Sequence, residues 1–472
     1  MNPCRVCALR TLGLTLAPPP PPLQPLLRYP RLKLNLNPRR TLVTAHSSSN
    51  STSTSASTST PKKKKKEKVL VISGPTGAGK SRLALELAKR LNGEIISADS
   101  VQVYRGLDVG SAKPSWSDRK EVPHHLLDIL HPSEDYSVGQ FFEDARQVTN
   151  SILENDHVPI VVGGTGLYLR WYVYGKPEVP KASPEFASEV YSEIIDLERD
   201  RNWDAAVKLV VEAGDPGALR LTCNDWYRLR RSLEILKSSG SPPSAFQVPY
   251  DSFRDQIKLQ KSESSPDVNF SGGGVELNIS PDLDYDFICF FLSNQRLDLY
   301  RMIDLRCEDM LSGHDGLLSE ATRLLDMGLL PNSNSATRAI GFRQAMEFLL
   351  QCREQGGSSP GEFFSFLSEF QKASRNFAKR QLTWFRNEDI YHWLNASQPL
   401  DKVVDFIYQV YHNQTGNVVV PKSLAMEKDL SSRREIAELK SYRPKNRYFI
   451  KREDCSEILD WIGRQMQCSA VH

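Results

Sequence analysis

One short segment of this 472-residue chain has the composition and spacing of a phosphate-binding loop. Residues 74–81 read GPTGAGKS and match the pattern G-x-x-x-x-G-K-[ST]. Glycines in such a loop let successive backbone N–H groups converge on phosphate oxygens, and the N-terminus of the following helix adds partial positive charge. Lys80 would neutralise the terminal phosphate, and the Ser81 hydroxyl would ligate Mg²⁺. The motif does not specify which phosphorylated compound binds.

The elements around this loop are typical of an α/β protein. Residues 68–74 (KVLVISG) are almost continuously apolar, as expected of a strand that is buried on both faces of a parallel sheet. Helical apolar spacing follows in residues 81–91, and residues 94–100 and 158–164 form two further short strands. Strands separated by helix-length segments indicate crossover units. We therefore expect a P-loop-type parallel sheet flanked by helices, with a mostly helical insertion and a helical C-terminal part.

The formal net charge of +3 conceals a strong asymmetry along the chain. Residues 1–66 contain twelve Lys or Arg and no Asp or Glu, which leaves 48 basic and 57 acidic residues, net −9, in residues 67–472. An Arg-rich, acid-free start followed by the Ser/Thr tract 47–60 is typical of a transit peptide and a disordered linker. Its length and hydroxylated residues favour a plastid, with a mitochondrion or the cytoplasm as alternatives. No run of about 18 apolar residues occurs, so we expect no membrane-spanning helix.

Seven ordered blocks of sequence resemble the tRNA dimethylallyltransferase (tRNA isopentenyltransferase) family, in its plant tRNA-type branch. They are GPTGAGKS, ISADSVQVYRGLDVGSAKP, VPHHLLDI with YSVGQFFEDA, VVGGTGLYL, NDWYRLRRSLEI, TRAIGFRQ and SRNFAKRQLTWFR. The resemblance implies transfer of a five-carbon prenyl group from dimethylallyl diphosphate to the N6 amine of an adenosine next to the anticodon of tRNA. The loop would then hold a diphosphate leaving group.

The same resemblance implies roles for individual residues. Asp99 matches the family carboxylate that accepts a proton or hydrogen bond from the adenine amine, and the alternative is a plain strand-end turn residue. Thr76 and Lys80 join Asp99 as expected catalytic residues, and Arg231 is the expected diphosphate clamp, with Arg228 as its rival. Mg²⁺ is the expected cofactor, with Ser81 as the metal ligand. The predicted diphosphate site is Gly74, Pro75, Thr76, Gly77, Ala78, Gly79, Lys80, Ser81 and Arg231.

A basic helix is the predicted tRNA-binding surface. Residues 372–386 contain five basic residues and no acidic one, and a helical wheel places most of them opposite Phe377, Trp384 and Phe385. An ordinary solvated helix face also explains this pattern. Residues 440–452 add six basic and three aromatic residues, which either stack on unpaired bases or form a disordered polar tail. The predicted tRNA-binding residues are Asp99, Ser100, Val101, Gln102, Thr165, Arg338, Gly341, Phe342, Arg343, Arg375, Lys379 and Arg380.

These predictions divide the chain into six segments and leave two other functions open. The segments are 1–66, transit peptide and linker; 67–183, catalytic core; 184–245, helical insertion with the clamp helix; 246–284, flexible insertion loop; 285–400, helical part with the tRNA surface; and 401–472, C-terminal extension. The first alternative is the same transfer to free AMP, ADP or ATP, and the second, less favoured, is a P-loop small-molecule kinase. We expect a monomer that binds tRNA and dimethylallyl diphosphate, binds no membrane, and produces cytokinin-type prenylated adenines.

Overall fold

The computed structural model describes residues 66–180, 183–255, 283–313, 315–413, 418–428 and 433–469. The chain forms two units, Met1–Lys63 and Lys64–His472, and the second contains all the helices and strands of the described residues. The predicted transit peptide and linker, apart from Lys66, lie outside the described residues, as do residues 256–282 of the predicted insertion loop. Its described part includes a short helix at 249–255, in which Tyr250 is buried.

A six-stranded parallel sheet with the order β3-β2-β4-β1-β5-β6 lies at the centre of this unit. The predicted P-loop-type parallel sheet is therefore confirmed, and β1, β2 and β4 correspond to the three strands expected from sequence. The apolar run that becomes β5 and the short strands β3 and β6 were not predicted. The strands are β1 (Lys68–Ser73), β2 (Gly93–Ser97), β3 (His124–His125), β4 (Val158–Gly163), β5 (Asp286–Ser293) and β6 (His392–Asn395).

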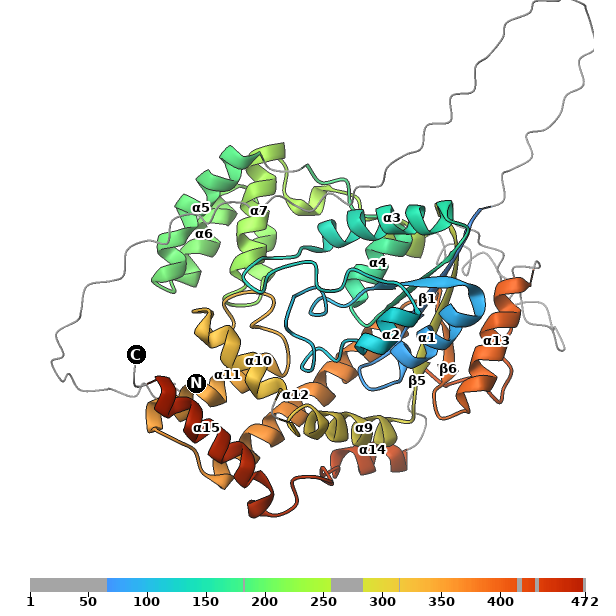
Figure 1. Cartoon of the computed structure of the whole chain (residues 1–472). Coiled ribbons are helices and arrows are strands. Elements are labelled where there is room, and N and C mark those ends of the chain that lie inside the picture. Colours follow the sequence, from blue (N-terminus) through green and yellow to red (C-terminus); the bar gives the residue numbers. More distant parts are fainter. Residues whose placement is uncertain are drawn as a thin grey trace, which may run out of the picture. The chain divides into compact units, whose positions relative to one another are not determined.

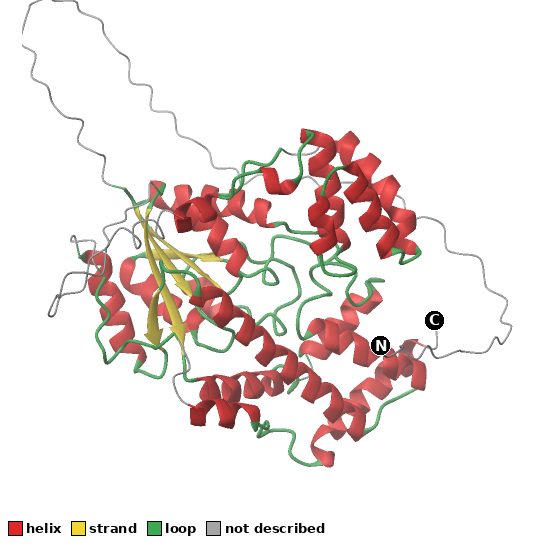
Figure 2. Cartoon of the chain, turned by 180° about the vertical axis from the view of Figure 1, so that it is seen from behind, coloured by secondary structure: helices red, strands yellow, loops and turns green. Residues whose placement is uncertain are grey.

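Alternating side chains of the central strand supply the cores on both faces of the sheet. Val69 and Val71 pack into one core, and Leu70 and Ile72 pack into the other. Burying each such side chain contributes about 1.5–3 kcal/mol. Figure 2 shows the strands as one yellow layer with red helices on both sides. One face is covered by α1 (Lys80–Leu91) and α13 (Leu400–His412), and the other by α3 (Val138–Glu154), α4 (Gly166–Tyr174), α9 (Arg296–Asp309) and α12 (Pro360–Arg386).

The helical insertion has a small core of its own, which includes Val190, Val210, Leu229 and Leu233. Its helices follow the expected pattern of residues 184–239. They are α5 (Pro184–Arg199), α6 (Trp203–Ala213), the 3₁₀ turn η1 (Pro216–Arg220) and α7 (Trp226–Ser239).

The C-terminal part is mostly helical, as predicted, and helix α12 in it is the longest. Its start is fixed by a capping box, in which the Ser359 hydroxyl accepts from the Glu362 N–H and the Glu362 carboxylate accepts from the Ser359 N–H. No helix in the described part of the chain is long and apolar enough to cross a membrane. The remaining elements are α2 (Trp116–Glu121), η2 (Pro243–Ala245), α10 (Leu317–Asp326), α11 (Phe342–Gln355), α14 (Arg433–Lys440), η3 (Arg452–Cys455) and α15 (Ser456–Ser469).

Candidate active site at the carboxyl ends of the strands

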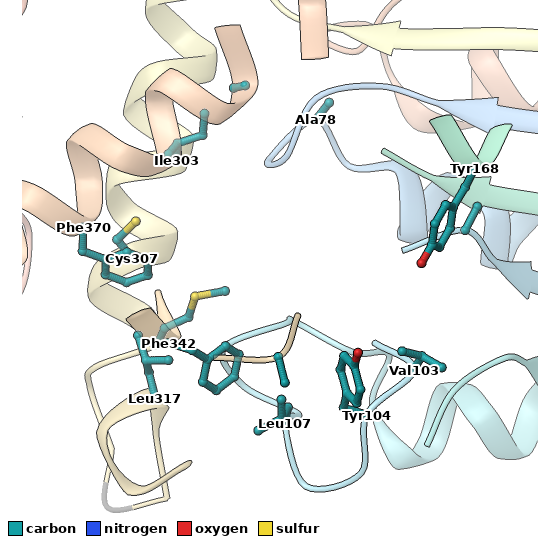
Figure 3. Close-up of a cluster of buried hydrophobic side chains, with 14 of the residues drawn as sticks. Ala78, Val103, Tyr104, Leu107, Tyr168, Ile303, Cys307, Leu317, Phe342 and Phe370 are labelled. Carbon is teal, nitrogen blue, oxygen red and sulfur yellow. The ribbon is translucent and has the colours of Figure 1, made fainter. Parts of the chain in front are cut away.

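Two connected chambers lie where β1, β2 and β4 end. The first, about 340 Å³, is lined by the phosphate loop from Thr76 to Ser81, and the second, about 410 Å³, extends towards α9 and α12. Thr76, Asp99 and Arg306 line both chambers, so these residues mark the junction. Figure 3 shows apolar residues of the second chamber, with Ile303, Cys307 and Phe370 on one side and Tyr168 across from them. The phosphate loop thus meets, at this junction, a chamber whose lining is partly apolar and partly charged.

The phosphate loop adopts a conformation that requires its glycines. Gly77 and Gly79 have φ angles of 82° and 85°, in the left-handed region that favours glycine. A Cβ added to Gly74 would lie 2.2 Å from the carbonyl oxygen of Leu292 on β5, so this position admits no side chain. Ala78 is buried in the core, and helix α1 starts at Lys80. The predicted loop therefore lies directly between β1 and α1.

Lys80 and Arg306 place two cations beside the loop. The Lys80 ammonium donates to the Pro75 carbonyl oxygen at 2.8 Å. Burial and the neighbouring Arg306 guanidinium lower the pKa of Lys80 to about 7, against an opposing effect of Asp99. Burial also lowers the pKa of Arg306. Both cations are therefore destabilised by desolvation, and a bound polyanion would relieve that cost.

Arg306 is the arginine that reaches the phosphate loop, and the sequence analysis missed it. It lies on α9, and its Nη1 donates to the Thr76 Oγ1 at 2.9 Å. The predicted clamp Arg231 lies on α7, where it donates to Glu234 at 2.9 Å and to the Pro180 carbonyl at 3.5 Å, and it lines neither chamber. The sequence signal for Arg306 was weak, because it is one of several arginines along this helix. A role for Arg231 at the diphosphate stays a prediction.

Asp99 both forms a turn and lines the site. Its Oδ1 accepts from the N–H groups of Val101 at 2.9 Å and Gln102 at 3.4 Å, which fixes the carboxylate just after β2. Its Oδ2 makes no hydrogen bond to any other described residue. Thr165, at the end of β4, accepts from the Ser100 N–H at 3.3 Å through its hydroxyl. Asp99 can therefore be a strand-end turn residue and still act as a carboxylate in the site, because the turn uses only Oδ1 and leaves Oδ2 available at the junction.

Gln381 of α12 is a second residue that the sequence analysis missed. Its side chain is buried and uses both ends of the amide, because Oε1 accepts from the Thr76 N–H at 2.9 Å and Nε2 donates to the Gly164 carbonyl at 3.0 Å. A Cβ on Gly164 would lie 2.2 Å from this Nε2. Gln381 thereby fixes α12 to the phosphate loop and to the end of β4.

Some of the predicted tRNA-binding residues meet at the second chamber. Its lining includes five of them in addition to Asp99: Ser100, Val101, Thr165, Arg338 and Arg380. Gln102 lines the first chamber instead, and its amide donates to the carbonyls of Ser111 and Ala112 at 3.2 and 3.3 Å. The strand-end residues and two arginines are thus brought together, although they are far apart in sequence.

Other predicted tRNA-binding residues have structural contacts or lie away from the chambers. Phe342 is fully buried in the core, and Gly341 caps α11 with a φ of 95°. Arg343 pairs with Glu347 at 3.6 Å. Arg375 is bound to the buried carboxylate of Asp304, and Lys379 is exposed.

The helical wheel was wrong about one residue of α12. It placed Phe377 on the buried apolar face, whereas Phe377 lines both chambers. Phe385 is buried in the core as expected. The reason is that α12 passes over the chambers, so an apolar side chain can face the site as well as the core.

The parallel sheet, the phosphate loop after β1 and the cleft at the strand ends define a P-loop-type α/β protein with a candidate active site at the carboxyl ends of its strands. Residues 102–388 match the family model described as IPP transferase, and residues 67–128 match the model described as isopentenyl transferase. The chain belongs to the IPP transferase family, which confirms the resemblance seen in the sequence.

Named relatives agree with this assignment. The tRNA dimethylallyltransferase 9 of Arabidopsis thaliana is 65% identical over 407 residues, which are 85% of this chain and 88% of that protein. A tRNA dimethylallyltransferase of Protochlamydia amoebophila (strain UWE25) is 38% identical over 345 residues, 73% of this chain and 88% of that protein. A solved structure described as a eukaryotic dimethylallyltransferase acting on tRNA has a TM-score of 0.53 at 24% identity, covers 73% of this chain and 80% of that chain, and shows the same fold.

The substitution Gln381→Met should weaken diphosphate binding as well as stability. It keeps the length of the side chain but leaves the Thr76 N–H and the Gly164 carbonyl unpaired, at a cost of about 1–3 kcal/mol each. Urea unfolding and calorimetric titration with diphosphate measure the two effects. Gln371→Met is the matched control, because Gln371 is also buried and hydrogen-bonded on α12 but lines neither chamber. Equal losses of diphosphate affinity in both variants would contradict the role of Gln381.

Diphosphate binding should take up a proton at pH 8. With a pKa of about 7, Lys80 is mostly neutral at this pH in the free protein, and a bound anion raises that pKa. Calorimetry in buffers of different ionisation enthalpy measures the uptake, and Lys80→Arg, which stays protonated, reports the proton exchange of the ligand itself. We expect wild type to take up more protons per bound diphosphate than this variant, by up to about 0.9 proton at pH 8 and about 0.1 proton at pH 6. The same uptake in both proteins at pH 8 would show that Lys80 does not titrate there.

Proposed function

We propose that this protein transfers the dimethylallyl group of dimethylallyl diphosphate to N6 of an adenosine next to the anticodon of tRNA. The supporting observation is the junction of the two chambers, where a cradle for a diphosphate meets the available oxygen of Asp99. The names of the relatives support the same reaction. A phosphate loop alone would fit a kinase equally well, but the apolar part of the second chamber, which includes Ile303 and Phe370, suits a prenyl chain.

The site residues provide the charge stabilisation that this reaction requires. The C–O bond of the allylic carbon breaks, the N6–C bond forms, and negative charge develops on the departing diphosphate. The phosphate loop, Lys80 and Arg306 would stabilise that charge, and their position at the first chamber supports this role. The adenine amine is a weak nucleophile, because its lone pair is delocalised into the ring. Asp99 would accept the proton that N6 loses as the N6–C bond forms.

The first chamber fits a magnesium ion that is held mainly by the substrate. The Ser81 hydroxyl lines this chamber, and no cluster of three or more His, Cys, Asp or Glu residues suited to a metal occurs among the described residues. Mg²⁺ usually binds to few protein ligands together with phosphate oxygens and water. Bound in this way, Mg²⁺ would neutralise charge on the diphosphate, while Ser81 supplies one oxygen ligand.

The remaining expectations rest on sequence composition. The acid-free N-terminal 66 residues support import into a plastid, with a mitochondrion or the cytoplasm as alternatives. We also propose that the enzyme acts as a monomer, and that turnover of the modified tRNA is a source of cytokinin-type prenylated adenines.

One assay separates the proposed function from its alternatives. Protein lacking residues 1–63 is incubated with dimethylallyl diphosphate, Mg²⁺ and either unmodified tRNA or free AMP and ATP, and N6-prenylated adenosine is measured. We expect product from tRNA. Prenylation of free nucleotides alone would identify an adenylate-type enzyme, and phosphorylation by ATP without prenyl transfer would identify a kinase.

The variant Asp99→Asn tests the chemistry in the same assay. It keeps an oxygen for the turn but loses the negative charge, so we expect kcat to fall on the order of 10²-fold or more with little change in tRNA binding. A loss of tRNA affinity that matches the loss of rate would point to a binding role instead.

Arg306→Gln should lower kcat/KM for dimethylallyl diphosphate far more than Arg231→Gln. Arg306 contacts the phosphate loop, whereas Arg231 pairs with Glu234 on its own helix. Loss of one donor of this kind costs on the order of 10²-fold or more. Steady-state kinetics at saturating tRNA measure both variants, and the opposite order would restore Arg231 as the clamp.

A further inference from the structure

The segment that joins α14 to α15 is fixed to the body of the protein along one side. The Tyr442 hydroxyl donates to the buried Asp304 carboxylate of α9 at 2.7 Å. Asn446 accepts from the Gln371 amide of α12 at 3.0 Å, and Phe449 is buried in the main core. The alternative of a disordered tail is therefore wrong for the described residues 440–452. In Figure 1 this red segment runs beneath α9 and α12.

Glu308 is the strongest of these attachments. It is fully buried, and its carboxylate accepts backbone N–H groups of Arg447, Tyr448 and Phe449 at 2.7–3.1 Å. A buried carboxylate destabilises the fold unless it is hydrogen-bonded. Glu308 of α9 therefore depends on the N–H groups of this segment, and the segment is held in place by Glu308. Two of the three aromatic residues that were candidates for base stacking, Tyr442 and Phe449, are used in packing.

The opposite side of the segment carries a row of exposed cations, of which Arg443 donates to the Tyr442 carbonyl at 3.2 Å and Arg447 lies 5.8 Å from the Tyr448 ring. Arg443, Lys445 and Arg447 are exposed and alternate with the residues that face the protein, as in an extended strand. None of the three forms an ion pair with an acidic residue in the described part of the chain. Alternate residues of an extended chain lie roughly 6–7 Å apart, so the three charges form a short, regular line.

The segment that carries this line of charges is attached to helix α12, on which Lys372 and Lys379 are exposed. Asn446 contacts Gln371, which is followed by the exposed Lys372, and the Arg375 guanidinium lies 5.5 Å from the Tyr442 ring. The match to the IPP transferase family model ends at residue 388, so the segment lies beyond it. The body of the chain, residues 67–472, carries net charge −9, so a polyanion can bind only where cations gather without acidic partners.

We propose that Arg443, Lys445 and Arg447, here named the basic track, bind phosphates of the tRNA backbone outside the reaction chambers. The proposal rests on the proposed function, because it takes tRNA as the partner. The attachments to Asp304 and Glu308 hold the backbone in place before tRNA binds. Binding therefore costs this segment little conformational entropy. Phosphate contacts of this kind add affinity and orientation without reading sequence.

The triple variant R443Q/K445Q/R447Q tests the basic track. Its control is R90Q/K402Q/K422Q, which removes the same number of exposed cations near α1 and α13, although Arg90 is ion-paired with Asp405. Filter binding of unmodified tRNA is measured as a function of salt, beside kcat and the KM for dimethylallyl diphosphate. We expect the track variant to bind tRNA on the order of tenfold more weakly, with the slope of log affinity against log salt smaller in magnitude by roughly 2–3. The two kinetic constants and the control variant should stay within about twofold of wild type.

Two further measurements keep the result unambiguous. The charge-conserving variant R443K/K445R/R447K should bind like wild type, because phosphate contacts need charge rather than a particular side chain. Thermal unfolding of the triple variant should match wild type, and if it does not, the single variant K445Q is used, with an expected change in slope of about 1.

Unchanged tRNA affinity and salt slope in the folded triple variant would overturn the proposal. Failure of the proposed function has a different signature, since it appears as wild-type protein that binds tRNA but does not prenylate it.

Discussion

The rest of the site depends on the buried amide of Gln381. Its two hydrogen bonds join helix α12, the phosphate loop and the end of strand β4, three parts that no local sequence holds together. The Thr76 N–H is bound to Gln381, and the Thr76 hydroxyl accepts from Arg306 of α9. One side chain thereby fixes the cradle for the leaving group to α12 and to the end of β4, the strand that pairs with β2, after which Asp99 lies. The Gln381 amide can approach the end of β4 this closely because Gly164 has no side chain.

A second constraint is electrostatic. Lys80 and Arg306 both line the first chamber with lowered pKa values, chiefly because of burial, and Asp99 offsets only part of the effect. Such a pair is unfavourable in the free protein and favourable once a diphosphate is bound. The folded chain therefore carries part of the cost of assembling the site in advance, which is the arrangement that transition-state stabilisation of a departing anion requires.

The sequence predicted the elements with local signals and missed those that depend on distant contacts. The phosphate loop, β1, β2 and β4 follow from spacing and apolar runs within a few residues. Arg306 and Gln381 reach the loop from 230 and 305 residues away, so nothing near them in the sequence indicates their roles. The helical wheel failed for Phe377 for a related reason, because a wheel cannot show that α12 passes over a cavity. The resemblance to a family located the reaction, but only the structure distinguishes Arg306 from Arg231 beside the loop.

The same limit applies to the prediction of an RNA surface from basic residues. Arg375 is as basic as Arg443, yet its charge is bound to the buried Asp304 and helps to hold α9 against α12. Arg443 lies on a segment whose backbone, rather than its cations, is attached to the buried carboxylate of Glu308. Pairing therefore decides which cations are free for a phosphate backbone, and pairing is a property of the fold. In a body with net charge −9, the unpaired cations mark the path that a polyanion can follow.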